Sequence, residues 1–248
     1  FTSWFNVARI KTEPDKLFTD DLGTELYRVL QGLQPDLIVV YMVWLPVMPI
    51  LEEFGCPKIL LIRECPEKWR HIRTGEHDFI DINPNDYDAA FSIEPNFCPE
   101  GFTPLPPLIL KNWNELPTAE EARNKLGVQE NRKCCLVAHN GRPGEFEAIL
   151  SENFGAGSSE YQLIISTNRD GKGLSLFPLI DYLPAADFVI GGAGYNLFYE
   201  CRYLDISGRF FCFERNAENT RWRVETNSSY RFKENGADIL ARQIAELI

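Results

Sequence analysis

Residues 187–200 read DFVIGGAGYNLFYE and join a short apolar run, a glycine-rich turn and the start of a helical pattern. Phe188–Ile190 predicts a buried strand, and Asn196–Tyr203 predicts the helix that follows it. Glycine lets a backbone approach a ligand closely, and a helix N-terminus offers N–H donors to an anion. The unit therefore predicts a phosphate site, with a purely conformational role of the glycines as the simpler alternative. It is not G-x-G-x-x-G, which disfavours a nicotinamide dinucleotide.

Apolar runs and helical patterns alternate on both sides of this unit, which predicts an α/β fold with parallel, doubly wound sheets. Strands are expected at Leu37–Val43, Lys58–Ile62, Ala89–Ile93, Cys134–Ala138, Leu163–Ser166 and Phe210–Phe213. Helices are expected at 16–33, 52–55, Ala119–Leu126, Glu145–Leu150 and Thr220–Glu225.

A proline-rich segment divides the chain into two halves. Six prolines lie between residues 95 and 117, where regular structure cannot propagate. We expect two Rossmann-like lobes, residues 1–110 and residues 111–248. The N-terminal lobe is expected to be short or truncated.

The composition restricts the classes of function. A formal net charge of −11 and a pI near 4.9 oppose binding to nucleic acid. The longest apolar run, Leu37–Leu51, contains two prolines and is shorter than the roughly 20 residues that cross a bilayer. Seven cysteines without a C-x-x-C pair fit a reducing compartment. We expect a cytoplasmic protein without a nucleic-acid partner, while peripheral membrane association and a partner chain or second copy stay open.

An acidic residue downstream of the glycine turn indicates which phosphate ligand would fit. Glu200 lies six residues after Gly194, about two helical turns along. From there a carboxylate can reach the paired hydroxyls of a ribose whose phosphates lie on the turn. For Glu200 alone, a solvated helix residue is the simpler alternative.

Residues 178–200, followed by an apolar strand and Glu218–Asn219, resemble the C-terminal domain of glycosyltransferase family 28, a GT-B group that includes MurG-type N-acetylglucosaminyltransferases. The resemblance implies that the glycine turn faces the diphosphate of a nucleotide-sugar donor and that Glu200 binds its ribose. It also implies sugar contacts from the Glu218–Asn219 pair, base recognition, usually of uracil, at 179–180, and a first glycine loop at 140–142. The implied donor-binding set is Asn140, Gly141, Arg142, Leu179, Ile180, Gly191, Gly192, Ala193, Gly194, Tyr195, Asn196, Glu200, Glu218 and Asn219.

The activity that the resemblance implies is transfer of a sugar from a UDP-linked donor to an unidentified acceptor, without a metal or a cofactor. Helix N-termini and a cation such as Arg142 or Arg215 would stabilise the leaving diphosphate. The sequence departs from the family in its first loop, His139–Arg142, which has a single glycine. The Gly/His-rich loop with which family members begin is not found, so the acceptor side is expected to be incomplete, truncated or supplied by another chain.

Arg63 and Glu64 are the candidate catalytic residues. They follow the Lys58–Ile62 strand, at the end where ligands of open α/β sheets lie. An arginine there could pair with a phosphate, and a glutamate could take a proton from an acceptor hydroxyl. The simpler alternative is a surface ion pair with Lys68 or Arg70.

Two other functions stay open. One is a non-catalytic nucleotide-sugar-binding subunit that needs a partner chain, and the other is a nucleotide-sugar hydrolase or epimerase on the same fold. Asp86-Tyr87-Asp88 is a candidate for metal binding. It is a minor one, because a pair of aspartates at this spacing has low specificity.

Overall fold

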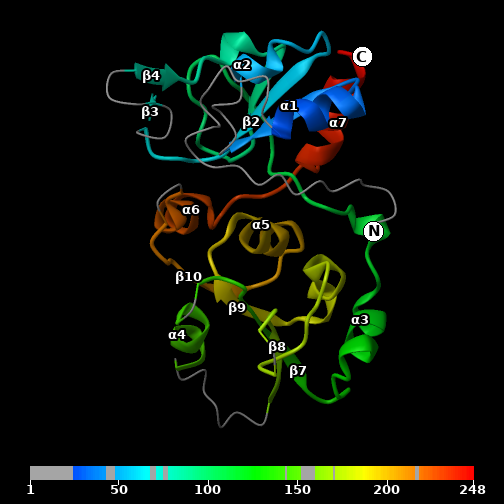
Figure 1. Cartoon of the computed structure of the whole chain (residues 1–248). Helices are drawn as coiled ribbons and strands as arrows, with labels where there is room; N and C mark the ends of the chain where they lie inside the picture. The colour runs from blue at the N-terminus through cyan, green and yellow to red at the C-terminus, as the bar shows by residue number, and fades with distance from the viewer. Residues whose placement is uncertain are drawn as a thin grey trace. The chain divides into compact units, whose positions relative to one another are not determined.

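A computed structural model of the protein describes residues 25–42, 48–67, 71–74, 78–142, 144–151, 160–169, 171–215 and 218–248 (Figure 1). The chain forms two compact units. One comprises the residues up to Leu105 together with Leu240–Ile248, and the other comprises Pro106–Ile239. The sequence had assigned 111–248 to a single lobe, whereas the contacts group the last residues of helix α7 (Gly236–Ala245) with the first unit.

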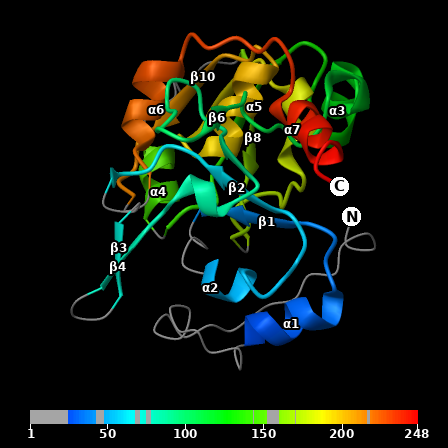
Figure 2. The ribbon, with the colours of Figure 1, turned by 90° about the horizontal axis from the view of Figure 1, so that it is seen from above.

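The first unit contains a parallel sheet in the order β1-β2-β5-β6. Its strands are β1 (Ile38–Tyr41), β2 (Lys58–Ile62), β5 (Ala89–Ser92) and β6 (Thr103–Pro104). Helices α1 (Glu25–Leu33) and α2 (Met48–Leu51) lie beside the β1–β2 pair in Figure 2. Leu26 and Leu30 of α1 pack against buried residues of these two strands, which explains the spacing of apolar residues in α1.

Several predictions for this unit can be compared with the structure. The strands expected at 58–62 and 89–93 are confirmed within one residue. Residues 16–24 of the predicted first helix and residue 43 of the predicted first strand lie outside the described residues. The short helix expected at 52–55 is wrong, because α2 spans Met48–Leu51 and is followed by a turn. The antiparallel hairpin of β3 (His71–Thr74) and β4 (Asp78–Asp81), and the short strand β6, were not predicted.

The second unit contains a parallel sheet in the order β10-β9-β7-β8. Its strands are β7 (Lys133–Ala138), β8 (Tyr161–Ser166), β9 (Phe188–Gly192) and β10 (Gly208–Phe211), and its helices are α3 (Ala119–Leu126), α4 (Glu145–Ser151), α5 (Tyr195–Tyr203) and α6 (Thr220–Asn227) (Figure 1). Every predicted strand and helix of this half is present, with bounds that differ by at most two residues. Because both faces of a doubly wound sheet are covered, β7 is buried from Cys134 to Ala138.

Helix α3 shows how local chemistry sets the bounds of an element. Thr118 accepts a hydrogen bond from the Glu121 backbone N–H, and the Glu121 side chain accepts one from the Thr118 N–H. This reciprocal capping satisfies donors that a helix N-terminus leaves unpaired. Gly127 ends the helix in the left-handed region at φ 65°, a conformation that glycine adopts without steric cost.

The two segments through which the chain passes between the units are tied together inside the second unit. The buried side chain of Asn235 accepts from the Ile109 N–H at 3.0 Å, and its amide donates to the Ile109 carbonyl at 2.9 Å. The same amide also donates to Asn112 Oδ1. A Cβ on Gly236 would collide with the Pro106 carbonyl, so the backbones approach as closely as a glycine allows.

Candidate functional site

A pocket of about 370 Å³ lies at the carboxyl ends of the strands of the second unit. In the order β10-β9-β7-β8, the chain leaves β7 towards β8 and leaves β9 towards β10. The two connections therefore diverge at this edge of the sheet. Parallel α/β sheets bind ligands at such a switch point. The pocket is lined by the segments after these strands, including His139–Gly141 and Gly192–Gly194.

Helix α5 begins at the pocket wall. Its N-cap is Gly194, which supplies no side-chain cap to the first backbone N–H groups. Asn196 and Leu197 of the first turn line the pocket together with Gly194. Because the positive end of the helix dipole lies at this point, the arrangement favours an anion here.

The preceding strand shows why glycine is needed in this turn. A Cβ on Gly191 would collide with the Ala138 carbonyl of β7, and a Cβ on Gly192 would lie 2.8 Å from the His139 ring. A Cβ on Gly194 would meet no atom within 4 Å. Two of these glycines are therefore required by the packing of β9, and Gly194 is the one whose absent side chain leaves space at the helix N-terminus.

Glu200 points into the same pocket from the second turn of α5. The residue is only 8% exposed, and its carboxylate makes no hydrogen bond or ion pair with any residue that the structure describes. Burial raises the pKa of Glu200 to about 7. A carboxylate without a protein partner at this depth is costly, and a ligand that donates hydrogen bonds would offset the cost.

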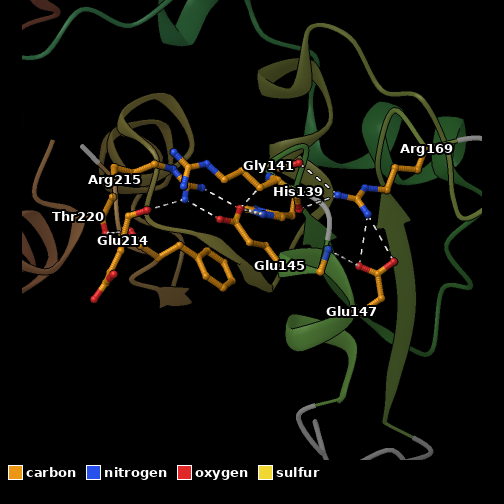
Figure 3. Close-up of polar contacts among 11 residues, drawn as sticks. His139, Gly141, Glu145, Glu147, Arg169, Glu214, Arg215 and Thr220 are labelled. Carbon is orange, nitrogen blue, oxygen red and sulfur yellow. Dashed lines mark hydrogen bonds and ion pairs between the residues drawn. The ribbon is translucent and has the colours of Figure 1, made fainter. Parts of the chain in front are cut away.

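The first loop of the unit is held by an ion pair between Arg215 and Glu145 (Figure 3). Arg215 Nη1 lies 2.5 Å from Glu145 Oε1, and Nη2 lies 2.7 Å from Oε2. Oε2 also accepts from the Arg142 backbone N–H at 2.9 Å and contacts His139 Nε2 at 3.0 Å. The Arg215 guanidinium and these further donors lower the pKa of Glu145 to about 2, so the carboxylate is ionised at neutral pH.

His139 lies against this carboxylate with only 7% of its side chain exposed. Burial is the largest effect on its pKa, which is lowered below the usual value. Since ionised Glu145 can only accept a hydrogen bond, the neutral imidazole carries its proton on Nε2, and Nδ1 is an acceptor. The ring packs on Phe213, with centroids 5.2 Å apart, and contributes to the pocket lining.

Arg169 fixes the other side of the loop. Its guanidinium donates to the carbonyls of Gly141 at 3.2 Å and Arg142 at 2.7 Å, and it pairs with Glu147 at 3.3 Å (Figure 3). Glu147 in turn accepts from the Gly144 N–H and from Lys172. These contacts hold the backbone at Gly141, Arg142 and Gly144 without the additional glycines of the family pattern.

The remaining walls are an apolar patch and an acidic residue. The patch consists of Leu110, Leu176, Phe177, Pro178 and Leu179, and Phe177 is 81% exposed. The acidic residue is Glu218, which lines the pocket and lies just before α6 in the sequence. The pocket thus combines an apolar side, a helix N-terminus and two carboxylates, which suits a ligand with a flat apolar group, an anion and hydroxyls.

The structure brings most of the predicted donor-binding residues together. Those that line the pocket are Asn140, Gly141, Leu179, Gly192, Ala193, Gly194, Asn196, Glu200 and Glu218. Those that do not line it are Arg142, Ile180, Gly191, Tyr195 and Asn219. Ile180 and Tyr195 are buried, and the Asn219 side chain accepts from the Trp222 N–H as the N-cap of α6. Of the two predicted cations, Arg215 lines the pocket and the exposed Arg142 does not.

Arg63 and Glu64 belong to the first unit, at the carboxyl end of β2. The Arg63 guanidinium lies 5.8 Å from the centroid of the Tyr41 ring. Glu64 is buried, and its backbone N–H donates to Glu94 Oε2 at 2.9 Å. Lys68 and Arg70, the alternative ion-pair partners, lie outside the described residues. A catalytic role of Arg63 and Glu64 stays a prediction.

The sequence did not identify Glu145 or Arg223 as site residues. Glu145 occurs in a helix start rich in acidic residues, where a carboxylate usually interacts with the backbone alone. Arg223 occurs in the middle of a polar helix, where an exposed side chain is expected, yet it is fully buried. Neither residue has a local pattern that reveals its long-range partner.

Two further findings concern metals and membranes. Within the described ranges, no group of three or more histidine, cysteine, aspartate or glutamate side chains is arranged to hold a metal ion. Among the same residues, no helix is both long and apolar enough to cross a bilayer.

No protein-family model and no curated protein matches this sequence. Solved structures resemble it in fold. The glycotransferase of kitacinnamycin is 14% identical, with a TM-score of 0.51 over 98% of this chain and 77% of that one. The spinosyn rhamnosyltransferase SpnG is 12% identical, with a TM-score of 0.50 over 78% and 58%. SsfS6, a glycosyltransferase of Streptomyces sp. SF2575, is 15% identical, with a TM-score of 0.46 over 82% and 61%.

The chain spans about three fifths of the length of SsfS6 and SpnG. Identity at this level shows the fold alone. The resemblance to family 28 therefore stays a prediction. The fold class is confirmed: the chain is an α/β protein with two Rossmann-like units of the kind found in GT-B glycosyltransferases.

Proposed function

We propose that the pocket of the second unit binds a nucleoside diphosphate sugar and that the protein transfers the sugar to an acceptor. The observation that carries the proposal is that Glu200 and the N-terminus of α5 line the same pocket. Glu200 is a buried carboxylate without a partner among the described residues, and the first turn of the same helix has no side-chain cap. A ligand with an anionic group next to a pair of hydroxyls would place the anion at the helix N-terminus and donate hydrogen bonds to Glu200.

The diphosphate is placed at the Gly192–Asn196 turn, where the helix dipole and the N–H groups of α5 stabilise negative charge. Among the described residues that line this pocket, Arg215 supplies the cationic side chain. Its charge is shared with Glu145, so the leaving diphosphate would rely mainly on backbone donors. This arrangement needs no divalent ion to bind the donor, and binding in the presence of EDTA tests that point.

The nucleoside is placed between Glu200 and the apolar patch. The ribose hydroxyls donate to the Glu200 carboxylate, and the base lies against the patch near Leu179 and the exposed Phe177 ring. Uracil remains the expected base. Glu218 is placed beside the sugar. The acceptor is assigned to the first unit, with Glu64 as the base, because Glu64 lies at the carboxyl end of a parallel strand.

Calorimetry with UDP-, TDP-, GDP- and ADP-glucose tests donor binding. We expect the pyrimidine compounds to bind most tightly, and Glu200→Ala to weaken their binding by ~1.5–3 kcal/mol, the value of a charge-assisted hydrogen bond. The matched control is Glu225→Ala, because Glu225 is an exposed residue of α6. If no nucleotide sugar binds, or if both alanine variants bind like the wild type, the donor-site proposal is wrong.

Release of the nucleoside diphosphate distinguishes transfer from the alternatives. The protein is incubated with the donor that binds best, with and without a mixture of hydroxyl-bearing acceptors. Release that depends on the acceptors supports transfer, and Glu64→Gln should then slow it without changing donor affinity. Release of free sugar without acceptors indicates a hydrolase. Binding without release indicates a nucleotide-sugar-binding subunit.

A further inference from the structure

Arg223 is the largest fully buried side chain of the described residues, with no exposed surface. It lies in α6, and its Nη1 donates to two groups outside that helix. One is the Ala193 carbonyl in the glycine turn at 2.8 Å, and the other is Glu218 Oε2 at 2.9 Å. The guanidinium also lies 5.8 Å from the centroid of the Tyr195 ring, at the start of α5.

An arginine is expensive to bury, and its partners must be fixed well to offset the loss of hydration. The Glu218 carboxylate is the ion-pair partner, and it lies at the pocket wall with 13% of its side chain exposed. The planar guanidinium donates hydrogen bonds in fixed directions, whereas the ammonium of a flexible lysine does not. Arg223 therefore holds one carboxylate oxygen of Glu218 at a defined distance from the Ala193 carbonyl.

The two ends of this connection lie at different parts of the pocket. Ala193 belongs to the turn that faces the proposed diphosphate, and Glu218 belongs to the segment placed beside the sugar. Glu218 precedes α6 outside any helix or strand, so its own element does not fix the rotamer of its side chain. The Arg223 bond therefore contributes directly to the position of the Glu218 carboxylate relative to the glycine turn.

We infer that Arg223 is a positioning residue that sets Glu218 against the glycine turn, so that recognition of the sugar depends on a buried arginine that does not touch the donor. The inference rests on the proposed donor site. Recognition of the sugar depends on Arg223, which acts through Glu218, whereas recognition of the nucleotide does not.

The test measures the ratio of the Kd of UDP to the Kd of UDP-glucose, or the corresponding pair for the nucleotide that binds best. Arg223→Met removes the guanidinium and keeps an apolar side chain of similar length. We expect this variant to lower the ratio about tenfold, the loss of one charge-assisted hydrogen bond, and to change the affinity for the nucleoside diphosphate much less. The control Arg221→Met removes an exposed arginine of the same helix and should leave the ratio unchanged.

A double-mutant cycle with Glu218→Gln tests whether Arg223 acts through Glu218. Glu218→Gln should lower the ratio by itself, and adding Arg223→Met should then have little further effect. Additive losses would overturn the inference, as would an unchanged ratio in Arg223→Met. Equal losses for the diphosphate and the diphosphate sugar would also overturn it, because Arg223 would then only hold the turn.

Failure of the proposed function gives a different result. If the wild type binds no nucleotide, the donor site itself is wrong. If the wild type binds nucleoside diphosphates with a ratio near one, the donor site stands and the sugar role of Glu218 and Arg223 falls. Should Arg223→Met lack a cooperative unfolding transition, Arg223→Lys replaces it, and a partial loss of the ratio is expected because the charge remains and the planar geometry is lost.

Discussion

Arg215 and Glu145 form a two-bond ion pair, with nitrogen–oxygen distances of 2.5 and 2.7 Å, across 70 residues of sequence. The pair joins the segment after β10 to the start of α4, and it places a positive side chain at the pocket while neutralising most of its charge. The anion-binding capacity of the pocket therefore depends more on backbone N–H groups than on a free cation.

Glu145→Gln should lower the free energy of unfolding by ~2 kcal/mol at pH 7, the effect of losing a hydrogen-bonded charge pair. The pKa of Glu145 is lowered from 4.5 to about 2, so this stabilisation is present above pH 4.5 and is lost as the pH falls towards 2. Urea unfolding at pH 7 and pH 3 measures both effects. The control Glu147→Gln, on the solvent side of the same helix, should have a smaller effect. An equal loss in both variants, or no change with pH, would contradict the prediction.

Glu200→Gln should stabilise the protein at pH 8 by ~1–3 kcal/mol, because the buried carboxylate is then ionised without a partner. The pKa of Glu200 is raised from 4.5 to about 7, so the folded state holds this proton more tightly than the unfolded state. The free energy of unfolding of the wild type therefore falls as the pH rises from 4.5 to 7 and is constant above that range. Thermal unfolding of both proteins from pH 5 to pH 8 measures the difference, which should shrink as the pH falls towards 4.5.

Donor binding should show the opposite pH dependence. Ribose hydroxyls donate more strongly to an ionised carboxylate, so the affinity of the wild type for a nucleotide sugar should rise between pH 6 and pH 8. The diphosphate of a nucleotide sugar carries no proton that titrates in this range. Glu200→Gln should bind more weakly with a flat profile, and calorimetry at three pH values checks this. A profile that stays steep in the variant would assign the pH dependence to another group.

Gly191→Ala and Gly194→Ala should separate stability from ligand binding. A Cβ at residue 191 collides with the Ala138 carbonyl, so Gly191→Ala should lower the free energy of unfolding by ~1–3 kcal/mol. A Cβ at residue 194 meets no atom within 4 Å, so Gly194→Ala should change stability by less than ~1 kcal/mol. The added methyl would occupy space at the N-terminus of α5, and affinity for a nucleoside diphosphate should fall. Normal affinity in Gly194→Ala would place the anion elsewhere.

Asn235→Ala should lower the free energy of unfolding by ~2–4 kcal/mol, because it leaves the buried N–H and carbonyl of Ile109 without partners. Chemical denaturation measures the loss. The matched control is Asn124→Ala, an exposed asparagine of α3, which should change stability by less than ~0.5 kcal/mol. Similar values for the two variants would show that the Asn235 contacts do not hold the two connecting segments.

The sequence predicted strands β7 to β10 and helices α3 to α6 of the second unit because their causes are local, and it did not predict α7. The β-branched and apolar runs need burial on a sheet, and Thr118 and Gly127 mark the ends of α3 through their own backbone geometry. The glycine turn and the spacing to Glu200 were also visible, since they depend on one strand and one helix. That these residues share a pocket follows from parallel strands whose carboxyl ends meet at one edge.

Long-range partners could not be predicted in this way. Nothing near Glu145 in sequence indicates Arg215, and nothing near Arg223 indicates that it is buried against Ala193. Glu200 is a helix residue whose burial, and hence whose pKa, depends on the walls around it. Local sequence sets which elements form, because propensity and capping act over a few residues. Charge, burial and positioning in the pocket arise only when distant segments are packed together, because electrostatic energies depend on the desolvation that packing creates.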